Sequence, residues 1–365
     1  MVTIRHGCVT LGDMAATSAH LQTPLPPPAP PRCTIVPPHI LRRLADQGHG
    51  PARHSLALDT GLREQRLAAA PPVAATQHLT RTVGDARHTE TLPGRTVRRE
   101  GGPAGADASV DRAYDGLGAT FALFREIYGR ASIDDAWLPL DATVHYGDRY
   151  DNAFWNGERM VFGDGDGEIF NDFTTCLDVI GHELTHGVTQ FTAELEYRNQ
   201  SGALNESLSD VFGSLVKQYA LGQTAAEADW LIGAGLLAPG IHGTALRSMK
   251  APGTAYDDER LGTDPQPSHM DGFVHTTRDG GGVHINSGIP NHAFYLAAQA
   301  LGGHAWQAAG RIWYDTLTGG LLSPSSGFTA FARATVATAS SHNPGYTGVA
   351  DAVAEAWSQV GIDTA

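Results

Sequence analysis

The sequence predicts an α+β protein with a mixed, strand-containing front half and a mainly helical rear half. Apolar residues recur at helical spacing over residues 107–128. Residues 140–170 instead alternate between apolar and polar and contain turn-forming glycines, which is typical of strands and hairpins. From Leu177 onward the pattern is mainly helical, except for long loops around 237–283. The ordered body is therefore expected to divide into a sheet-rich front lobe and a helical rear lobe.

A separate front region precedes this body in a chain of 365 residues, which is long enough for two domains and a tail. Proline-rich residues 23–31 are typical of a disordered tail, and a short helix that starts at proline is expected over 37–46. Residues 68–75 are rich in alanine and proline, which predicts an exposed, cleavable linker. The predicted division is a disordered tail over 1–32, a front segment with its linker over 33–75, a front lobe over 76–190 and a rear lobe over 191–365.

The composition excludes several classes of function. A formal net charge of −14 argues against a nucleic-acid partner, because phosphate binding needs a basic face. Residues 1–100 carry a balance of +5 and the remainder −19, so the two parts could attract each other, although such asymmetry can also serve solubility alone. No apolar run is long enough for a transmembrane helix.

The compartment is left open by two features. Residues 1–19 lack the basic start and apolar core of a secretory signal peptide. Cys176 is the only cysteine of the body, so the fold suits a reducing or an oxidising environment. We therefore expect secretion by a non-classical route, with a cytoplasmic location as the alternative.

The strongest chemical signal is the pattern His182-Glu183-x-x-His186. Positions i and i+4 share one face of an α-helix, so the two imidazoles can bind the same metal ion. Glu183 flanks that site, where it can take a proton from a water at the metal. The alternative is a pair of surface histidines on an amphipathic helix.

A third ligand is expected because a catalytic zinc takes three protein ligands and leaves its fourth position to water. Glu206 lies twenty residues after His186 on a second predicted helix and can complete a set of two histidines and one carboxylate. Asn205 and Asp210 are placed to accept the free ring N–H groups of the ligand histidines. Alone, Glu206 would be read as a solvated helix residue; beside the first motif it indicates a zinc site.

Three further motifs have two readings each. His284 follows a glycine run, so on a flexible loop it could donate a hydrogen bond to the oxyanion formed in peptide hydrolysis, with Asp279 orienting it; otherwise it is an ordinary loop histidine. Residues 152–157 could form an edge strand that pairs with an extended peptide, or a strand with core aromatics. Residues 163–168 lack the spacing of an EF-hand, so a hairpin turn is expected there rather than a calcium loop.

Together these residues resemble the thermolysin family of zinc metalloproteases over roughly residues 80–365. The shared motifs, in the family order, are 152–156, 182–186, 205–210, 245–249 and 281–288. The closer resemblance is to the protealysin-like branch, through Pro37-Pro38, Leu92-Pro93-Gly94, Tyr114-Asp115-Gly116 and Ser132-Ile133-Asp134-Asp135. That branch has short propeptides and lacks classical signal peptides.

The resemblance implies a two-lobed fold with the zinc helix between the lobes, and an endopeptidase that prefers a large apolar residue after the scissile bond. It assigns one zinc to His182, His186 and Glu206, water activation to Glu183, oxyanion stabilisation to Tyr197 and His284, and orientation of His284 to Asp279. It assigns binding of the substrate backbone to Asn152, Ala153 and Arg247, and the apolar pocket to Phe170, Phe173, Val179 and Leu246.

Two rival functions stay open at this point. One is a non-catalytic zinc protein of the same fold; Glu183 speaks against it, because a scaffold needs no base. The other is an adhesion or toxin module whose cleft only binds peptide, in which the oxyanion groups Tyr197 and His284 would be superfluous. The expected partners are protein or peptide substrates and the chain's own propeptide, with no nucleic acid and no membrane, and a monomer is expected.

The resemblance also implies a precursor that processes itself, with cleavage expected between residues 50 and 80; a Cys33 thiolate on the zinc is a less favoured way to keep it inactive. Calcium is not expected at the paired site of many relatives. Asp178, Asp210 and Asp229 persist there, but the other acidic positions have become Lys217, Leu231 and Ala234. If the helices run antiparallel, the Lys217 ammonium approaches Asp178 and offsets the repulsion of the carboxylates. The alternative is that Lys217 points to solvent.

Overall fold

The computed structural model describes residues 34–64, 77–342, 344–345 and 347–364. The predicted tail, Cys33 and the predicted linker over 68–75 lie outside these ranges. The front segment begins the described chain with two helices, α1 (Pro38–Asp46) and α2 (Gly50–Glu64). The expected helix over 37–46 is confirmed, with proline in its first turn and Ile40, Leu41 and Leu44 buried. Helix α2 was not predicted.

The front lobe is built on a five-stranded sheet in the order β2-β1-β3-β5-β4. The strands are β1 (Arg81–Asp85), β2 (Arg95–Arg99), β3 (Leu140–Val144), β4 (Ala153–Trp155) and β5 (Met160–Phe162). Strands β1, β3 and β5 are parallel, and β2 and β4 pair antiparallel at the two edges. The expected edge strand near residues 152–157 is therefore confirmed as β4, whereas β1 and β2 were not predicted.

The predicted helix of the front lobe is confirmed as α3 (Ala108–Ala122), continued by the π-helical turn η1 (Leu123–Ile127). The Asp107 carboxylate caps α3 by accepting from the N–H groups of Ser109 and Val110. The expected hairpin at 163–168 is wrong. The segment leaves the sheet after β5 as a loop, because the Asp166 carboxylate accepts the backbone N–H groups of residues 168–170 and closes a local turn.

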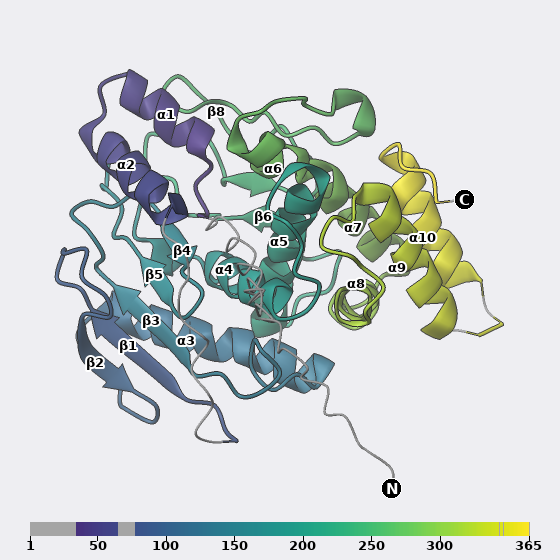
Figure 1. The fold of residues 1–365 in the computed structure, drawn as a ribbon, viewed down its shortest axis with the longest axis horizontal. Helices are drawn as coiled ribbons and strands as arrows, with labels where there is room; N and C mark the ends of the chain where they lie inside the picture. The colour runs from purple at the N-terminus through teal and green to yellow at the C-terminus, as the bar shows by residue number, and fades with distance from the viewer. Residues whose placement is uncertain (1–33, 65–76, 343, 346, 365) are drawn as a thin grey trace, which may run out of the picture.

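Two long helices, α4 (Leu177–Gln190) and α5 (Asn199–Leu221), occupy the centre of the molecule (Figure 1). A short 3₁₀ turn, η2 (Phe173–Thr175), precedes α4. Every residue of α4 from Asp178 to Thr189 is buried. The two helices approach closely at Gly213, where an added Cβ would lie 2.4 Å from the Asp178 carbonyl oxygen. This close packing fixes the side chains of α4 against those of α5.

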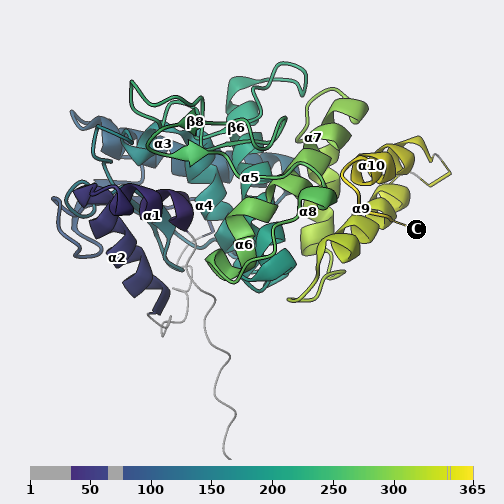
Figure 2. The same cartoon turned by 90° about the horizontal axis from the view of Figure 1, so that it is seen from above.

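The rear lobe is mainly helical, as expected, and its helices stack to one side of α5 (Figure 2). They are α6 (Asp279–Asn286), α7 (Gly288–Leu301), α8 (Ala309–Thr318), α9 (Phe328–His342) and α10 (Gly348–Gln359). The loops between α5 and α6 contain the 3₁₀ turn η3 (Met270–Gly272) and the short strands β6 (Leu231–Ile232), β7 (Arg247–Ser248), β8 (Asp257–Asp258) and β9 (Gly262–Thr263). Among the described residues, none of the helices is both long and apolar enough to span a bilayer.

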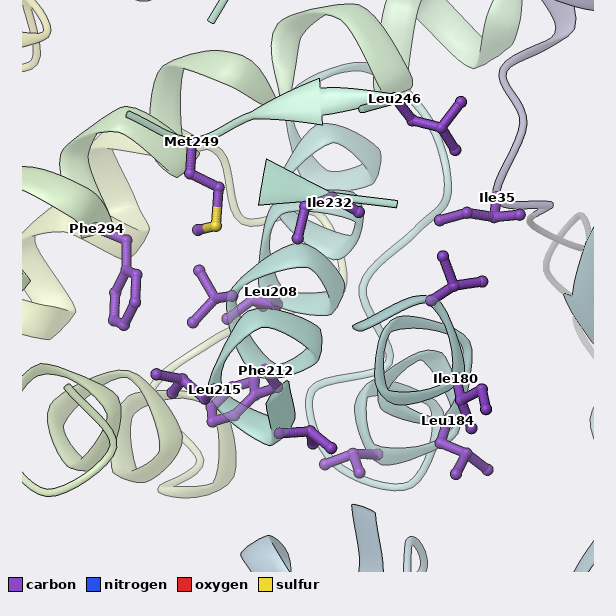
Figure 3. Packing of buried hydrophobic residues seen from close by; sticks show 14 of the residues in the cluster. Ile35, Ile180, Leu184, Leu208, Phe212, Leu215, Ile232, Leu246, Met249 and Phe294 are labelled. Carbon is purple, nitrogen blue, oxygen red and sulfur yellow. The ribbon is translucent and has the colours of Figure 1, made fainter. Parts of the chain in front are cut away.

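One apolar core joins both lobes and the front segment. Figure 3 shows part of it, with Leu208, Phe212 and Leu215 of α5 at its centre. Ile35, which precedes α1, is fully buried in the same cluster. The front segment is thus packed into the core of the body, close to the helices that carry the predicted zinc ligands.

Candidate active site

The three predicted zinc ligands converge at the crossing of α4 and α5. The Nε2 atoms of His182 and His186 lie 3.1 Å apart. Each lies 3.6 Å from a carboxylate oxygen of Glu206. All three side chains are buried, and their donor atoms lie within 4.8 Å of one another. The spacing of the sequence motif therefore places three ligand atoms around one point.

Neighbouring side chains hold the two imidazoles in a ligating orientation. His182 Nδ1 lies 2.8 Å from Asp210 Oδ1, and His186 Nδ1 lies 2.8 Å from Asn205 Oδ1. Both contacts occur as the sequence predicted; the Ser209 hydroxyl, 3.1 Å from His186 Nδ1, was not anticipated. With the Nδ1 protons engaged in this way, both Nε2 lone pairs are available to a metal.

Asp210 has two further partners that the sequence did not reveal. Its carboxylate accepts two hydrogen bonds of 2.8 Å from Arg247, through Nε and Nη2. It also accepts one of 2.8 Å from the Asn291 amide of α7. One fully buried carboxylate thus receives four donors and joins a ligand histidine to a predicted substrate-binding arginine. Arg247 and Asn291 come from elements 37 and 81 residues away, which is why no local pattern could find the contact.

Glu183 lies beside the ligands with one carboxylate oxygen satisfied and one not. Its Oε2 accepts from the Trp155 backbone N–H at 3.0 Å, whereas Oε1 is buried without a hydrogen-bond partner among the described residues. Burial, and then the Glu206 charge, raise the pKa of Glu183 well above its usual value. A buried acceptor without a donor is costly, and a water in the fourth position of a zinc ion would satisfy it. The residues present therefore fit a catalytic zinc.

Tyr197, His284 and Asp279 form the other wall of the site. The Tyr197 hydroxyl donates to Glu206 and lies 3.2 Å from His284 Nε2. Asp279 Oδ1 lies 2.7 Å from His284 Nδ1, and Oδ2 accepts from the His284 backbone N–H at 3.0 Å. Burial alone would lower the pKa of His284, but Asp279 and Glu206 outweigh it and raise that pKa. The arrangement favours an imidazolium whose Nε2–H can donate to an oxyanion.

The expectation that His284 lies on a flexible loop is wrong, because it is buried within α6. The first residues of α6 form a left-handed turn rather than regular helix, with φ of 53° at Asp279 and 60°, 95° and 78° at Gly280, Gly281 and Gly282. At Gly281 an added Cβ would also lie 2.4 Å from the Asn199 side chain. The glycine run therefore makes a tight turn that fixes His284 against Asp279.

Comparisons with known proteins agree with this geometry. Residues 72–190 match the family model described as thermolysin metallopeptidase, catalytic domain, and residues 193–362 match its alpha-helical domain. The chain belongs to the thermolysin family of metallopeptidases. The predicted fold class and enzyme class are thereby confirmed: the protein is a two-lobed, zinc-dependent metalloendopeptidase.

Individual relatives support the protealysin-like branch. An extracellular metalloprotease of Pectobacterium carotovorum subsp. carotovorum is 55% identical over 343 residues, which are 91% of this chain and 97% of the relative. A thermolysin of Alicyclobacillus acidocaldarius is 39% identical over 76% of this chain and 50% of the relative. The solved precursor of protealysin from Serratia proteamaculans superposes with a TM-score of 0.83 at 52% identity, covering 90% of this chain and 99% of that one.

In this metallopeptidase the front segment lies across the residues predicted to bind substrate backbone. The Ile35 N–H donates to the Ala153 carbonyl at 3.1 Å, which extends the edge of the sheet at β4. Arg247 Nη1 donates to the Ile35 carbonyl at 3.1 Å. Asn152 brackets Val36, accepting its N–H at 2.9 Å and donating to its carbonyl at 3.4 Å. All three predicted backbone binders are thus occupied by the chain's own residues.

The predicted apolar pocket belongs to the same region. Phe170, Phe173, Val179 and Leu246 are all buried in one apolar cluster with Ile35. Figure 3 shows Ile35 and Leu246 together at one edge of that cluster. Ile35, a large apolar residue of the front segment, therefore lies beside Leu246 of the predicted pocket.

Helix α2 adds a polar docking contact that sequence reasoning missed. Its buried Asp59 accepts from the Tyr150 hydroxyl at 2.5 Å and from Asn152 Nδ2 at 2.8 Å. Ser55 accepts the Asp151 backbone N–H at 2.9 Å. These contacts join the metallopeptidase body to a helix about ninety residues earlier in the chain. The bond to Asp59 also fixes the orientation of the Asn152 side-chain amide.

Lys217 lies where the sequence analysis placed it, facing Asp178. Its ammonium lies 2.7 Å from Asp178 Oδ2 and 2.9 Å from Asp229 Oδ1, and it donates to the Leu231 carbonyl at 2.9 Å. Burial lowers its pKa, but Asp178 and Asp229 outweigh burial and raise it. The reading in which Lys217 points to solvent is therefore wrong, because the side chain is engaged by three oxygen groups.

Proposed function

We propose that this metalloendopeptidase binds its zinc through His182, His186 and Glu206 and uses Glu183 as the general base. The observation that carries the assignment is the convergence of the three ligand atoms beside a buried Glu183 oxygen without a donor. When bound, the zinc would supply Lewis acidity and lower the pKa of the attacking water.

The remaining side chains have distinct roles in peptide hydrolysis. Glu183 accepts the proton of the attacking water and passes it to the leaving amine. Tyr197 and His284 donate to the oxyanion, and Asp279 keeps the His284 ring in place. This assignment is supported by the short distances that join Tyr197, His284 and Asp279.

Substrate selection would reside in two groups of residues. Ala153 and Arg247 would hold the backbone of the residue after the scissile bond, as they hold Ile35, and Asn152 would hold the next residue, as it holds Val36. Phe170, Phe173, Val179 and Leu246 surround the side chain after the scissile bond and favour a large apolar one. The burial of Ile35 among the same cluster supports this preference.

The central test is Glu183→Gln, which removes the base and leaves all three ligands. The variant should keep one zinc per chain and lose casein hydrolysis by about 10²–10⁴-fold, the usual effect of losing a proton-transfer group. His182→Ala should lose both metal and activity. Retention of more than about a tenth of the activity by Glu183→Gln would reject the base assignment. A chelator-insensitive casein hydrolysis would reject the zinc site.

We further propose that residues 33–75 are a removable inhibitory propeptide, followed by a front lobe over 76–190 and a rear lobe over 191–365. The occupation of the backbone-binding residues by Ile35 and Val36 supports inhibition. The likeness to a solved protease precursor supports processing. Of the interval 50–80 expected for cleavage, residues 50–64 are helical, and proteases seldom cut within a packed helix, so we place the cut after residue 64. Purified Glu183→Gln protein should stay full length on a gel.

Three remaining assignments concern the surroundings of the enzyme. Lys217 supports the proposal that the paired calcium site is absent. Relatives named extracellular support secretion, for which we propose a non-classical route, with a cytoplasmic location as the alternative. The protein would act as a monomer on protein or peptide substrates, without nucleic acid or membrane. Cell fractionation, N-terminal sequencing and light scattering test these points together.

A further inference from the structure

We propose that the enzyme cuts its own chain between Thr34 and Ile35, and that the propeptide then stays bound with Ile35 as its new N-terminus. The inference rests on the proposed active site. The peptide bond concerned is distinct from the linker over 68–75. The inference follows from which backbone groups of residues 34–36 contact which residues of the site.

The direction of the bound segment is set by its hydrogen bonds. Ile35 is held by Ala153 at its N–H and by Arg247 at its carbonyl, and Asn152 holds both polar groups of the next residue, Val36. A substrate whose first residue after the scissile bond is Ile35 would make the same contacts. The bond offered for cleavage is then the one on the amino side of Ile35.

The register is fixed by the three carbonyl groups of the segment. The Ile35 carbonyl is taken by Arg247 and the Val36 carbonyl faces Asn152, so neither meets an oxyanion donor. The Thr34 carbonyl oxygen lies 3.2 Å from His284 Nε2. That same nitrogen lies 3.2 Å from the Tyr197 hydroxyl and 3.6 Å from Glu206 Oε2. Among these three carbonyls, the one that would become the oxyanion is therefore that of Thr34.

The chemistry needs only water. One water adds to the Thr34 carbonyl carbon, and the bond from that carbon to the Ile35 nitrogen breaks. Thr34 ends as a carboxylate and Ile35 as an amine, and the second proton of the water is released to solvent. Glu183 takes the proton from the water and delivers it to the Ile35 nitrogen. Ile35 also supplies the large apolar side chain that the site is proposed to prefer after the scissile bond.

The cut would not release the propeptide, because its other contacts do not depend on the broken bond. Arg43 of α1 donates to the carbonyls of Arg260 and Glu259 at 3.1 and 3.2 Å. Asp59 of α2 keeps its contacts with Tyr150 and Asn152. Residues 35 onward would thus occupy the product side of the site until the linker is cut as well.

The test uses the full chain, purified in a zinc chelator and then supplied with zinc. Mass spectrometry should detect a chain or fragment that begins at Ile35, formed at a rate independent of protein concentration, because the bond lies in its own active site. Ile35→Leu should preserve this product, since leucine is large and apolar. Ile35→Asp should abolish it, since a carboxylate does not fit an apolar site, and Glu183→Gln should give none.

Two further measurements distinguish a failure of self-cleavage from a failure of docking or of folding. Zinc-free protein reports docking without catalysis: Ile35→Asp should lower its melting temperature and Ile35→Leu should leave it nearly unchanged. Mature enzyme from Ile35→Asp lacks residue 35 and should hydrolyse casein normally, which excludes a folding defect of the body. Casein hydrolysis and linker cleavage without an Ile35 terminus would overturn the self-cleavage alone. Self-cleavage would also be overturned if the rate constant for forming the Ile35 terminus rose in proportion to protein concentration, or if Ile35→Asp were cleaved normally. Absence of casein hydrolysis by the wild type would instead refute the proposed active site.

Discussion

Two groups of acidic side chains at or beside α4 and α5 differ in where their positive charge comes from. At the start of α4, Asp178 and Asp229 meet the ammonium of Lys217, so the chain supplies its own cation. One turn later, His182 begins the zinc site, where the described residues supply three ligand atoms and a Glu183 oxygen without a donor. The difference shows that the same pair of helices can make one charge cluster permanent and leave the other dependent on a bound ion.

Removal of zinc should give the largest effect that separates the two groups. A chelator of zinc should abolish casein hydrolysis, since both Lewis acidity and the activated water depend on the ion. A calcium-selective chelator should leave activity and melting temperature nearly unchanged, because the Lys217 ammonium already pairs with Asp178 and Asp229. Activity assays and melting curves in each chelator make the comparison. A large rise in melting temperature with millimolar calcium would contradict the interpretation of Lys217.

Lys217→Met should be the next largest effect, on stability rather than on chemistry. The variant leaves Asp178, whose side chain is 2% exposed, buried without its cation, which typically costs about 3 kcal/mol or more. The matched control is Glu168→Gln, which breaks an exposed pair with Arg149 and should change stability far less. Urea unfolding of both variants measures the difference. Equal midpoints would show that the Lys217 contact contributes no more than a surface pair.

Lys217→Glu should make the Asp178 cluster depend on a bound cation, as the zinc site does. It would place a third carboxylate beside Asp178, Asp229 and the Leu231 carbonyl, and calcium binds such sets of six to eight oxygens. We expect a lower melting temperature without calcium and partial recovery in millimolar calcium. Glu168→Gln serves again as the control and should not respond. A variant that is destabilised but indifferent to calcium would mean that the oxygens cannot surround an ion.

Asn291→Leu should have a smaller effect, on zinc dissociation and kcat/KM, which acts through Asp210 and His182. Loss of the amide leaves Asp210 with three donors and frees it to rotate away from His182 and Arg247. We expect zinc to dissociate faster and kcat/KM to fall about tenfold, at the low end for residues that position a metal ligand. Thr316→Val removes a buried hydrogen bond far from the site and is the control. Equal zinc release from the two variants would exclude a positioning role.

The smallest expected effect concerns a cation that titrates, His145. A hydrogen bond to Asp164 first, then one to Asp107, raises its pKa to about 9. Because the folded pKa is above the unfolded value, the stabilisation is complete below about pH 6.5 and is lost as pH rises to 9. His145→Gln should flatten the fall in stability across that window, measured by urea midpoints, whereas exposed His275→Gln should not. A slope unchanged by His145→Gln would show that other groups set it.

The zinc ligands were predictable because their information is local. A spacing of four residues puts His182 and His186 on one helix face, and Lys217 follows Glu206 by about three turns of the same helix. Helix α1 and strand β4 were likewise predictable from proline placement and alternation. Helix periodicity depends only on residues near one another in the sequence, so it can be predicted without knowing the tertiary contacts.

What could not be predicted depends on partners far apart in the chain. The contact of Ile35 with Arg247 spans 212 residues, and that of Asp59 with Tyr150 spans 91. Helix α2 has no strong apolar stripe, because part of its docking is through Asp59 and Ser55 rather than through burial of leucines. His284 was placed on a loop because a glycine run normally marks flexibility; here its left-handed turn is fixed by the close approach of Asn199.

The four donors on Asp210 make metal binding and peptide binding thermodynamically linked. Arg247 contacts both the Ile35 carbonyl and Asp210, and Asp210 contacts the ligand His182. Whatever factor zinc adds to the affinity for a backbone carbonyl at Arg247, that carbonyl must add to the affinity for zinc. An enzyme with its propeptide bound should therefore retain its ion longer than the same enzyme after release. Release of the propeptide would then be accompanied by faster loss of zinc.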